Sequence, residues 1–378
     1  MKTACSNRIL HSLAPARFTQ VVLALVLGLG VGTARGQEPA PLPVAIAPAD
    51  GNLRYVGRFD HSDAAGPRCA WSASTVIVRF RGTALNALLA GKGEDFWQVY
   101  LDGQPTEVIQ LKEGQTRYEV ATNLSAGEHQ VELAKRTEFN VGFTQILGFQ
   151  LSADGALLPA PPAPDRRIEV IGDSISCGYG NEAPTKEEKF TPLRENACIA
   201  YGALAARDLG ADYVCVAWSG KKLWPNNSIL DFYERILPES AGASAPWDFA
   251  AYTPQAVIIN LGTNDYGVAD PDGPGWEAAY RALIQRLRKQ YPDAWIYPTL
   301  GTMLGDWPAP RKPASTIRQC LTGLVAECQA AGDSRVRFID FGTQLPADGF
   351  GGSWHPSAAT HRKMAAKLTR TLKQDLKW

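Results

Sequence analysis

Hydrophobic and polar positions divide the chain into two regions with different periods. Across residues 53–151, short runs rich in β-branched and aromatic residues alternate with polar turns, and Asp102-Gly103 between two runs predicts a hairpin. Regular short strands with turn signals are typical of an antiparallel β-sandwich, and we expect one of the jelly-roll kind. The expected strands lie at residues 74–80, 96–101, 107–111, 117–121, 129–134 and 143–151.

From residue 168 onward, short apolar runs alternate with longer segments of helical period. This alternation is typical of a parallel sheet covered by helices, so we expect an α/β fold for this region. The expected strands lie at residues 168–171, 213–217, 256–261, 294–299 and 336–341, and the expected helices at 196–209, 276–291, 314–331 and 357–376.

The N-terminus and a proline-rich stretch set the expected domain boundaries. Three basic residues precede an apolar run at residues 21–31 and then Ala34-Arg35-Gly36, a pattern that predicts a secretory signal peptide cleaved after Gly36. Farther along, the segment before residue 168 contains four prolines, which is typical of a semi-rigid linker. We therefore expect a signal peptide at residues 1–36, a β-sandwich domain at 37–152, a linker at 153–167 and an α/β domain at 168–378.

Composition indicates a soluble globular protein and a partner without strong charge. The 378 residues suffice for two cores, and 45% hydrophobic with 20% charged residues is typical of a soluble globular protein. Because 38 basic residues balance 38 acidic ones, the chain has no net field for nucleic acid or anionic lipid, and we expect a neutral partner. The signal pattern predicts a secreted or periplasmic protein with no membrane contact after cleavage.

The cysteines permit disulfides in an oxidising compartment. Cys320 and Cys328 lie eight residues apart on one expected helix. At about 1.5 Å per residue they are about 12 Å apart, which is too far for a disulfide. Cys177 and Cys198 form the candidate pair, and the alternative is that both are buried free thiols.

Reactive residues follow the ends of the expected parallel strands. In an open parallel sheet, the loops beyond the carboxyl ends of the strands converge on one crevice. Ser174 follows the first strand, and His355 follows a glycine-rich loop after the fifth. This pair suits acyl transfer, because an imidazole can accept the serine proton and return it to the leaving alcohol.

The same strand ends offer donors for an oxyanion. The tetrahedral intermediate of acyl transfer carries a negative oxygen that needs preorganised hydrogen-bond donors. The candidates are the backbone N–H of Ser174, the backbone N–H of Gly220 after the second strand, and the side-chain amide of Asn264 after the third. Each residue alone could be an ordinary turn or capping residue. Their order at successive strand ends favours an active site.

Four short blocks carry a resemblance to a known class. Gly172-Asp173-Ser174, Gly220, Gly262-Thr263-Asn264-Asp265 and His355-Pro356 resemble the four blocks of SGNH (GDSL-type) hydrolases. The longer string at 171–181, followed by Glu195-Asn196 and preceded by the β-rich region, resembles carbohydrate esterase family 2 more narrowly.

The resemblance implies a jelly-roll domain packed on an SGNH-type three-layer α/β/α domain. It implies the removal of O-acetyl groups from xylan, mannan or a related polysaccharide or oligosaccharide. Ser174 would be the nucleophile, His355 the base, and Gly220 and Asn264 oxyanion donors. No metal or organic cofactor is implied.

One position departs from the wider SGNH pattern, which has an aspartate three residues before the histidine. Here that position is Gly352, so another group must hold the imidazole in the right tautomer. Three alternatives stay open: a backbone carbonyl at residues 351–353, which would give a Ser-His dyad, the carboxylate of Asp348, or a more distant acid. Asp173 and Asp265 are expected to brace loops through backbone N–H groups.

Trp354, beside His355, is expected to contact substrate, because aromatic faces suit the apolar faces of sugar rings. Trp218 is expected to pack in the core. The first alternative function is a lipase, thioesterase or general carboxylesterase of the same class, which the polar loops at 186–194 and 270–275 disfavour. The second is a non-catalytic polysaccharide-binding protein, which the presence of all the candidate site residues disfavours.

Overall fold

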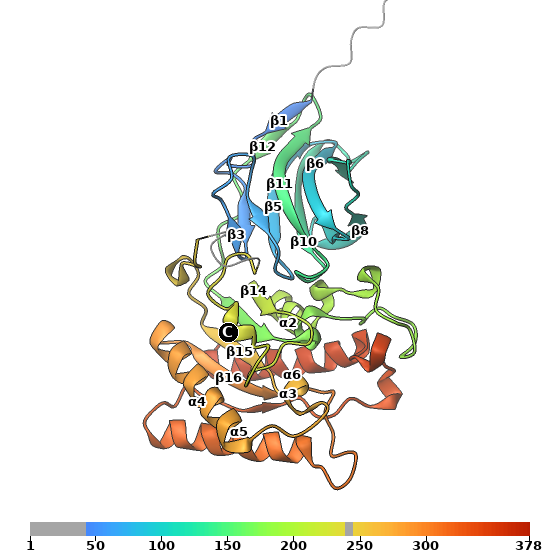
Figure 1. The fold of residues 1–378 in the computed structure, drawn as a ribbon. Helices are drawn as coiled ribbons and strands as arrows, with labels where there is room; N and C mark the ends of the chain where they lie inside the picture. The colour runs from blue at the N-terminus through green and yellow to red at the C-terminus, as the bar shows by residue number, and fades with distance from the viewer. Residues whose placement is uncertain (1–42, 239–244) are drawn as a thin grey trace, which may run out of the picture. The chain divides into compact units, whose positions relative to one another are not determined.

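The computed structural model describes residues 43–238 and 245–378, so the expected signal peptide lies outside the described residues. None of the described helices has the length and apolar character needed to cross a membrane. Two six-stranded sheets form the N-terminal part of the described chain (Figure 1).

The strands of this N-terminal part pair antiparallel. The first sheet runs in the order β3 (Phe59–Asp60), β4 (Arg68–Cys69), β11 (Gly142–Leu151), β6 (Leu85–Gly93) and β9 (Arg117–Ala121), and β1 (Val44–Ile46) pairs with β11. The second runs in the order β12 (Ala156–Leu158), β5 (Thr75–Gly82), β10 (Gly127–Lys135), β7 (Phe96–Leu101) and β8 (Gln104–Gln110), and β2 (Arg54–Val56) pairs with β5.

The period-two pattern explains how these sheets bury a core. In β11, side chains alternate between buried and partly exposed positions, as in a strand with one face on a core. Phe80, Leu89 and Trp97 are fully buried together, and the expected antiparallel sandwich is confirmed. Strand β6 is not among the expected runs, because its leucine, alanine, asparagine and glycine residues favour strands weakly. Strand β12 lies within the stretch expected as a linker.

The C-terminal part contains the expected parallel sheet with helices. Its strands run in the order β14 (Asp212–Ala217), β13 (Arg167–Gly172), β15 (Ala256–Asn260), β16 (Trp295–Leu300) and β17 (Ile339–Asp340). Its α-helices are α1 (Ser174–Cys177), α2 (Tyr201–Leu209), α3 (Thr263–Tyr266), α4 (Gly273–Gln290), α5 (Pro313–Ala330) and α6 (Ala358–Leu376).

Neighbouring residues of each parallel strand face different cores. In β13, Val170 packs in the cluster formed with α2 and α6, whereas Ile171 packs in the cluster formed with α4 and α5. Figure 1 shows these two pairs of helices on opposite faces of the sheet, so the three-layer α/β/α arrangement is confirmed. Because β13 lies between β14 and β15, the strand order reverses beside β13. Ligand crevices form at such a switch point.

All six described cysteines are free thiols. Cys177 and Cys198, the candidate pair, therefore do not form a disulfide, and the alternative of two buried free thiols is correct. The two thiols point to different partners: Sγ of Cys177 lies 3.6 Å from a carboxylate oxygen of Glu138, and Sγ of Cys198 lies 3.8 Å from the carbonyl oxygen of Ala134. Cys320 and Cys328 do not pair, as their helical spacing predicts.

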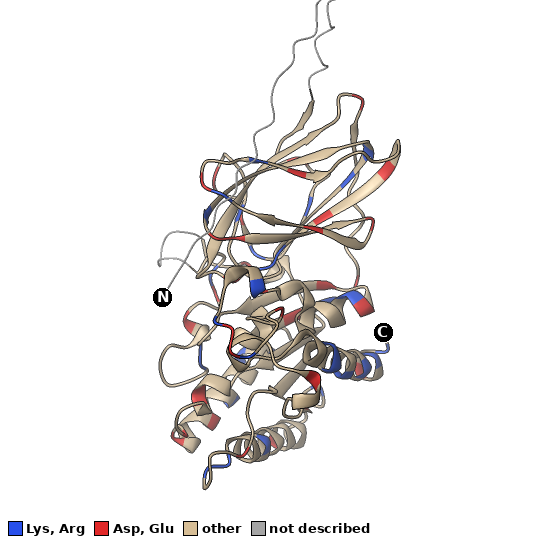
Figure 2. Ribbon diagram, turned by 90° about the vertical axis from the view of Figure 1, so that its right-hand side faces the viewer, with Lys and Arg blue, Asp and Glu red and all other residues tan. Residues whose placement is uncertain are grey.

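Charged residues of both signs are interspersed over both the sandwich and the α/β part (Figure 2). Many of them pair across neighbouring elements, as Arg288 does with Asp333 at 2.8 Å. The even mixture agrees with the balance of 38 basic and 38 acidic residues in the sequence.

Candidate active site

Ser174 and His355 meet although 181 residues separate them in the chain. Oγ of Ser174 lies 2.9 Å from Nε2 of His355, which is hydrogen-bond distance. Ser174 is 5% exposed, and His355 is partly buried. A hydroxyl and an imidazole in this contact can exchange a proton directly.

Ser174 is the first residue of α1, immediately beyond the carboxyl end of β13. Asp173 caps this short helix, and its side chain accepts a hydrogen bond of 3.0 Å from the N–H of Ile175. The N–H of Ser174 belongs to the first turn, whose N–H groups have no carbonyl partner within the helix. This N–H is therefore free to donate a hydrogen bond to an oxygen atom of a ligand bound beside Ser174.

Backbone carbonyl groups hold the other nitrogen of His355. Its Nδ1 lies 3.1 Å from the carbonyl oxygen of Ser353 and 3.3 Å from that of Gly352. These contacts favour the tautomer with the proton on Nδ1, so that Nε2 faces Ser174 as a proton acceptor. Ser353 and Trp354 have positive φ angles of 52° and 63°, a strained conformation for residues other than glycine that is held at this loop.

The carboxylate of Asp348 pairs with a lysine and not with the imidazole of His355. Its Oδ1 atom accepts a hydrogen bond of 2.5 Å from Nζ of Lys363. Within the described part of the chain, the polar contacts of His355 Nδ1 are carbonyl oxygens and not a carboxylate. A Cβ atom at Gly352 would lie 2.9 Å from the carbonyl oxygen of Glu188, so the loop packs too closely for an aspartate at the position of the wider pattern.

We predict that Asp348→Asn leaves kcat/KM within about threefold of the wild type. The carboxylate pairs with Lys363 and does not contact the imidazole. The measurement is kcat/KM for hydrolysis of an acetyl ester. A fall near the roughly 10⁴-fold loss seen when the acid of a catalytic triad is neutralised would contradict the dyad arrangement.

The three candidate oxyanion donors lie beyond neighbouring strands. Gly220 has φ of +77°, and a Cβ atom there would meet nothing within 4 Å, so this turn faces open space. No acceptor in the described part of the chain takes a hydrogen bond from the N–H of Gly220. Nδ2 of Asn264 donates to the carbonyl oxygen of Lys221 at 2.9 Å and is 3.5 Å from a carboxylate oxygen of Asp173.

Asp265 braces the loop that follows this turn. Its carboxylate accepts hydrogen bonds from the backbone N–H groups of Leu223 and Trp224 and from Nε1 of Trp276. Like the helix cap made by Asp173, this is the loop-bracing role expected from the sequence. The two acids thus fix the strand-end loops and leave the serine and the histidine to face each other.

Burial sets the protonation state of His355. Loss of hydration lowers its pKa from the usual 6.5 to about 4, although the two carbonyl contacts oppose this shift. The ring of Tyr179 covers the imidazole, with 4.2 Å between the centroids. The imidazole is therefore neutral, and able to accept a proton, well below pH 6.5.

We predict that the acid limb of the kcat/KM profile has its midpoint near pH 4 and not near 6.5. If His355 is the base, protonation of Nε2 removes it, so activity should fall as the pH drops through the pKa of His355 in the free enzyme. The measurement is kcat/KM for an acetyl ester between pH 3 and pH 8, with folding checked by circular dichroism. A midpoint at or above 6.5 would indicate an unshielded imidazole or a carboxylate partner.

Asp173, a second buried titratable group, could add its own limb to the pH profile, so it needs a control variant. Burial raises the pKa of Asp173 to about 7. The profile should therefore be measured with Asp173→Asn as well, since asparagine keeps an acceptor for the helix cap but does not titrate. A limb near pH 4 that persists in this variant is assigned to His355.

The two tryptophans near the site, Trp354 and Trp218, differ in solvent exposure. Trp354 is 53% exposed, and Nζ of Lys186 lies over its ring, 4.1 Å from the ring centroid. Trp218 is partly buried and packs against Phe139, with 4.8 Å between the ring centroids, as its expected packing role requires. Tyr179 was not among the candidate residues, although it lies in the string that follows Ser174.

Comparison with known families matches both parts of the chain. Residues 55–161 match the family described as carbohydrate esterase 2 N-terminal, and residues 170–363 match the GDSL-like lipase/acylhydrolase family. The chain is 41% identical over 332 residues to the cellulase/esterase CelE of Acetivibrio thermocellus. That match covers 86% of this chain but only 40% of CelE, so the chain spans less than half of that relative.

Two further relatives match over most of their length. An acetylxylan esterase / glucomannan deacetylase of Cellvibrio japonicus is 30% identical over 344 residues, covering 88% of this chain and 91% of that protein. The solved structure of a family two carbohydrate esterase from Clostridium thermocellum, in complex with cellohexaose, is 40% identical with a TM-score of 0.81. It covers 86% of this chain and 99% of the solved chain.

Proposed function

Since the chain belongs to carbohydrate esterase family 2, we propose that it is a secreted esterase that removes O-acetyl groups from xylan or a related polysaccharide or oligosaccharide. The observation that carries the proposal is the 2.9 Å contact between Oγ of Ser174 and Nε2 of His355. Its orientation suits a Ser-His dyad, because Nδ1 already contacts backbone carbonyl groups.

In the acylation step, Oγ of Ser174 attacks the carbonyl carbon of the acetyl ester while its proton passes to Nε2 of His355. The carbonyl oxygen becomes an oxyanion that accepts hydrogen bonds from the N–H groups of Ser174 and Gly220 and from the amide of Asn264. The intermediate collapses as the bond to the sugar oxygen breaks. His355 then returns the proton to that oxygen, which leaves as a hydroxyl group.

Deacylation repeats these roles with water. Nε2 of His355 accepts a proton from a water molecule, whose oxygen attacks the acetyl carbon of the acyl-enzyme. The same donors stabilise the second oxyanion. When the bond to Oγ breaks, the proton returns to Ser174 and acetic acid is released. Proton transfers within this cycle need no metal or organic cofactor.

The names of the relatives and the residues beside the Ser174–His355 pair support a sugar ester as substrate. One relative is named for acetylxylan and glucomannan, and another was solved with cellohexaose. We propose that Trp354, 53% exposed and next to His355, contacts a sugar ring of the substrate. The loop at residues 186–194 beside it is rich in charged residues, which suits a hydroxylated surface better than an acyl chain.

The proposed location rests on the sequence. Basic residues followed by an apolar run at 21–31 and by small residues fit a secretory signal, and an acetylated wall polysaccharide would be met outside the cytoplasm. Determination of the N-terminal residue of the protein exported by its host tests this part. A mature protein that keeps residues 1–36 would contradict it.

Acetate release tests the proposed function directly. The wild-type protein should release acetate from acetylated xylan or acetylated glucomannan, and with 4-nitrophenyl esters kcat/KM should fall steeply as the acyl chain grows from two to eight carbons. Preference for chains of eight carbons or more would favour the lipase alternative. Binding to polysaccharide without acetate release would favour the non-catalytic alternative.

A further inference from the structure

A loop of the N-terminal sandwich, residues 136–141 between β10 and β11, contacts the α/β domain next to the candidate active site. Glu138 in this loop is fully buried, and its Oε2 atom accepts a hydrogen bond of 2.6 Å from the backbone N–H of Ser219. The ring of Phe139 packs edge-on against Trp218. The loop therefore contacts two consecutive residues of the turn that follows β14.

The contacted turn carries one of the proposed oxyanion donors. Gly220 follows Ser219 directly, so the N–H of Gly220 belongs to the planar peptide unit that joins the two residues. Its direction depends on how Ser219 is held. A hydrogen bond from the N–H of Ser219 to a fixed acceptor limits the rotation of this residue, and with it the direction of the next N–H.

Glu138 is itself fixed from several sides. Its backbone N–H donates to Oε2 of Glu195 at 3.0 Å, and the thiol of Cys177 lies 3.6 Å from its carboxylate. Glu195 and Cys177 are fully buried residues of the α/β domain. Burial raises the pKa of Glu138, because a charged carboxylate loses hydration here. An acceptor enclosed in this way has little freedom to move, and its hydrogen bond is not weakened by water.

We propose that Glu138 is a positioning residue for the oxyanion site: a carboxyl group of the N-terminal sandwich orients the Ser219–Gly220 turn without touching the substrate. The inference rests on the proposed function and deepens it. It gives the N-terminal domain a part in the acetyl transfer itself, because the α/β domain alone would lack the acceptor that holds this turn.

Three substitutions separate the position of the acceptor from its ability to ionise. Glu138→Gln keeps an oxygen acceptor at the same reach but cannot ionise, whereas Glu138→Asp keeps the carboxyl group but withdraws the acceptor by one methylene. Glu138→Ala removes both. We expect kcat to fall about 10- to 100-fold in the Asp and Ala variants, because a misplacement of about 1 Å can cost about 10²-fold, while the Gln variant stays within about threefold.

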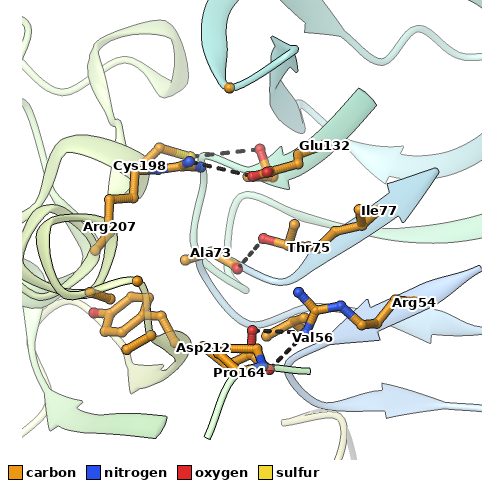
Figure 3. A pocket seen from close by; sticks show the side chains of 17 residues that line it. Arg54, Val56, Ala73, Thr75, Ile77, Glu132, Pro164, Cys198, Arg207 and Asp212 are labelled. Carbon is orange, nitrogen blue, oxygen red and sulfur yellow. Dashed lines mark hydrogen bonds and ion pairs between the residues drawn. The ribbon is translucent and has the colours of Figure 1, made fainter. Parts of the chain in front are cut away.

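KM and a matched control separate positioning from general stability. KM should change less than about twofold, because the oxyanion forms only in the transition state. The control is Arg54→Met, which removes the ion pair of 2.8 Å between Arg54 and Asp212 across the same two domains (Figure 3). Asp212 begins β14 and the turn follows its other end, about 16 Å away at about 3.3 Å per residue. Arg54→Met should lower the melting temperature but leave kcat unchanged.

Hydrogen exchange tests the same inference without a measurement of activity. Amides of the turn, residues 218–221, should exchange faster in Glu138→Ala and Glu138→Asp than in the wild type, and at the wild-type rate in Arg54→Met. Unchanged exchange, or kcat in the Asp and Ala variants within twofold of the Gln variant, would overturn the inference. If the wild type releases no acetate, the proposed function fails, while the exchange comparison still decides whether Glu138 holds the turn.

Discussion

Ser174→Ala is expected to lower kcat for acetate release by about 10⁴- to 10⁶-fold, the range found when the nucleophile of a serine hydrolase is removed. Alanine has no oxygen to attack the ester, and the chain offers no second hydroxyl in contact with Nε2 of His355 within its described residues. The fold should not change, because the hydroxyl makes its contact with His355 alone among the side chains of the described residues. Acetate release from an acetylated polysaccharide measures the loss.

The double variant Ser174→Ala, His355→Ala sharpens this test. Two residues that act as one unit lose their function together. The kcat of the double variant should therefore lie within about threefold of the kcat of Ser174→Ala alone. Asp348→Asn serves as the matched control for a neighbouring substitution that should spare the reaction. If Ser174→Ala retained more than about 1% of the wild-type kcat, another group would be the nucleophile and the dyad would be wrong.

The strand-end residues of the site could be predicted because of the way parallel sheets are built. Strands buried on both faces are continuous apolar runs, as in β15, so the position where each ends is visible in the sequence. The resemblance to carbohydrate esterase family 2 is confirmed by the comparisons, and with it the pairing of a jelly roll with a GDSL-type domain. Which strands are neighbours is not visible in such runs. The order β14, β13, β15 places Ser174 between the loops that carry Gly220 and Asn264.

Glu138 could not be predicted, since nothing in its surroundings along the chain marks it. It lies 36 residues before Ser174 in another domain, and a glutamate in a loop is usually a solvated residue. Its burial arises from the packing of the two domains. The choice between a Cys177–Cys198 pair and two free thiols stayed open in the sequence for a related reason: spacing along the chain says nothing of where each thiol points. Both cases concern side-chain direction across an interface, which a hydrophobic pattern does not encode.

Asn264→Ala is expected to lower kcat by about 10²- to 10³-fold, the usual effect of removing one side-chain donor from an oxyanion site. In the free enzyme, Nδ2 of Asn264 already donates to the carbonyl oxygen of Lys221 at 2.9 Å. An amide nitrogen carries two hydrogens, so one can hold this backbone contact while the other faces the oxyanion. The weak contact of 3.5 Å to Asp173 is the one that an oxyanion would replace.

The kinetic pattern of Asn264→Ala distinguishes a donor from a loop brace. A donor to the oxyanion acts only in the transition state, so kcat and kcat/KM should fall by equal factors while KM stays within about twofold. A brace for the Lys221 backbone would instead disturb the turn in the free enzyme. Faster hydrogen exchange at residues 218–221, together with a raised KM and a kcat within about threefold of the wild type, would contradict the donor role. Equal losses in kcat and kcat/KM with unchanged exchange would place the amide of Asn264 on the oxyanion, beside the N–H groups of Ser174 and Gly220.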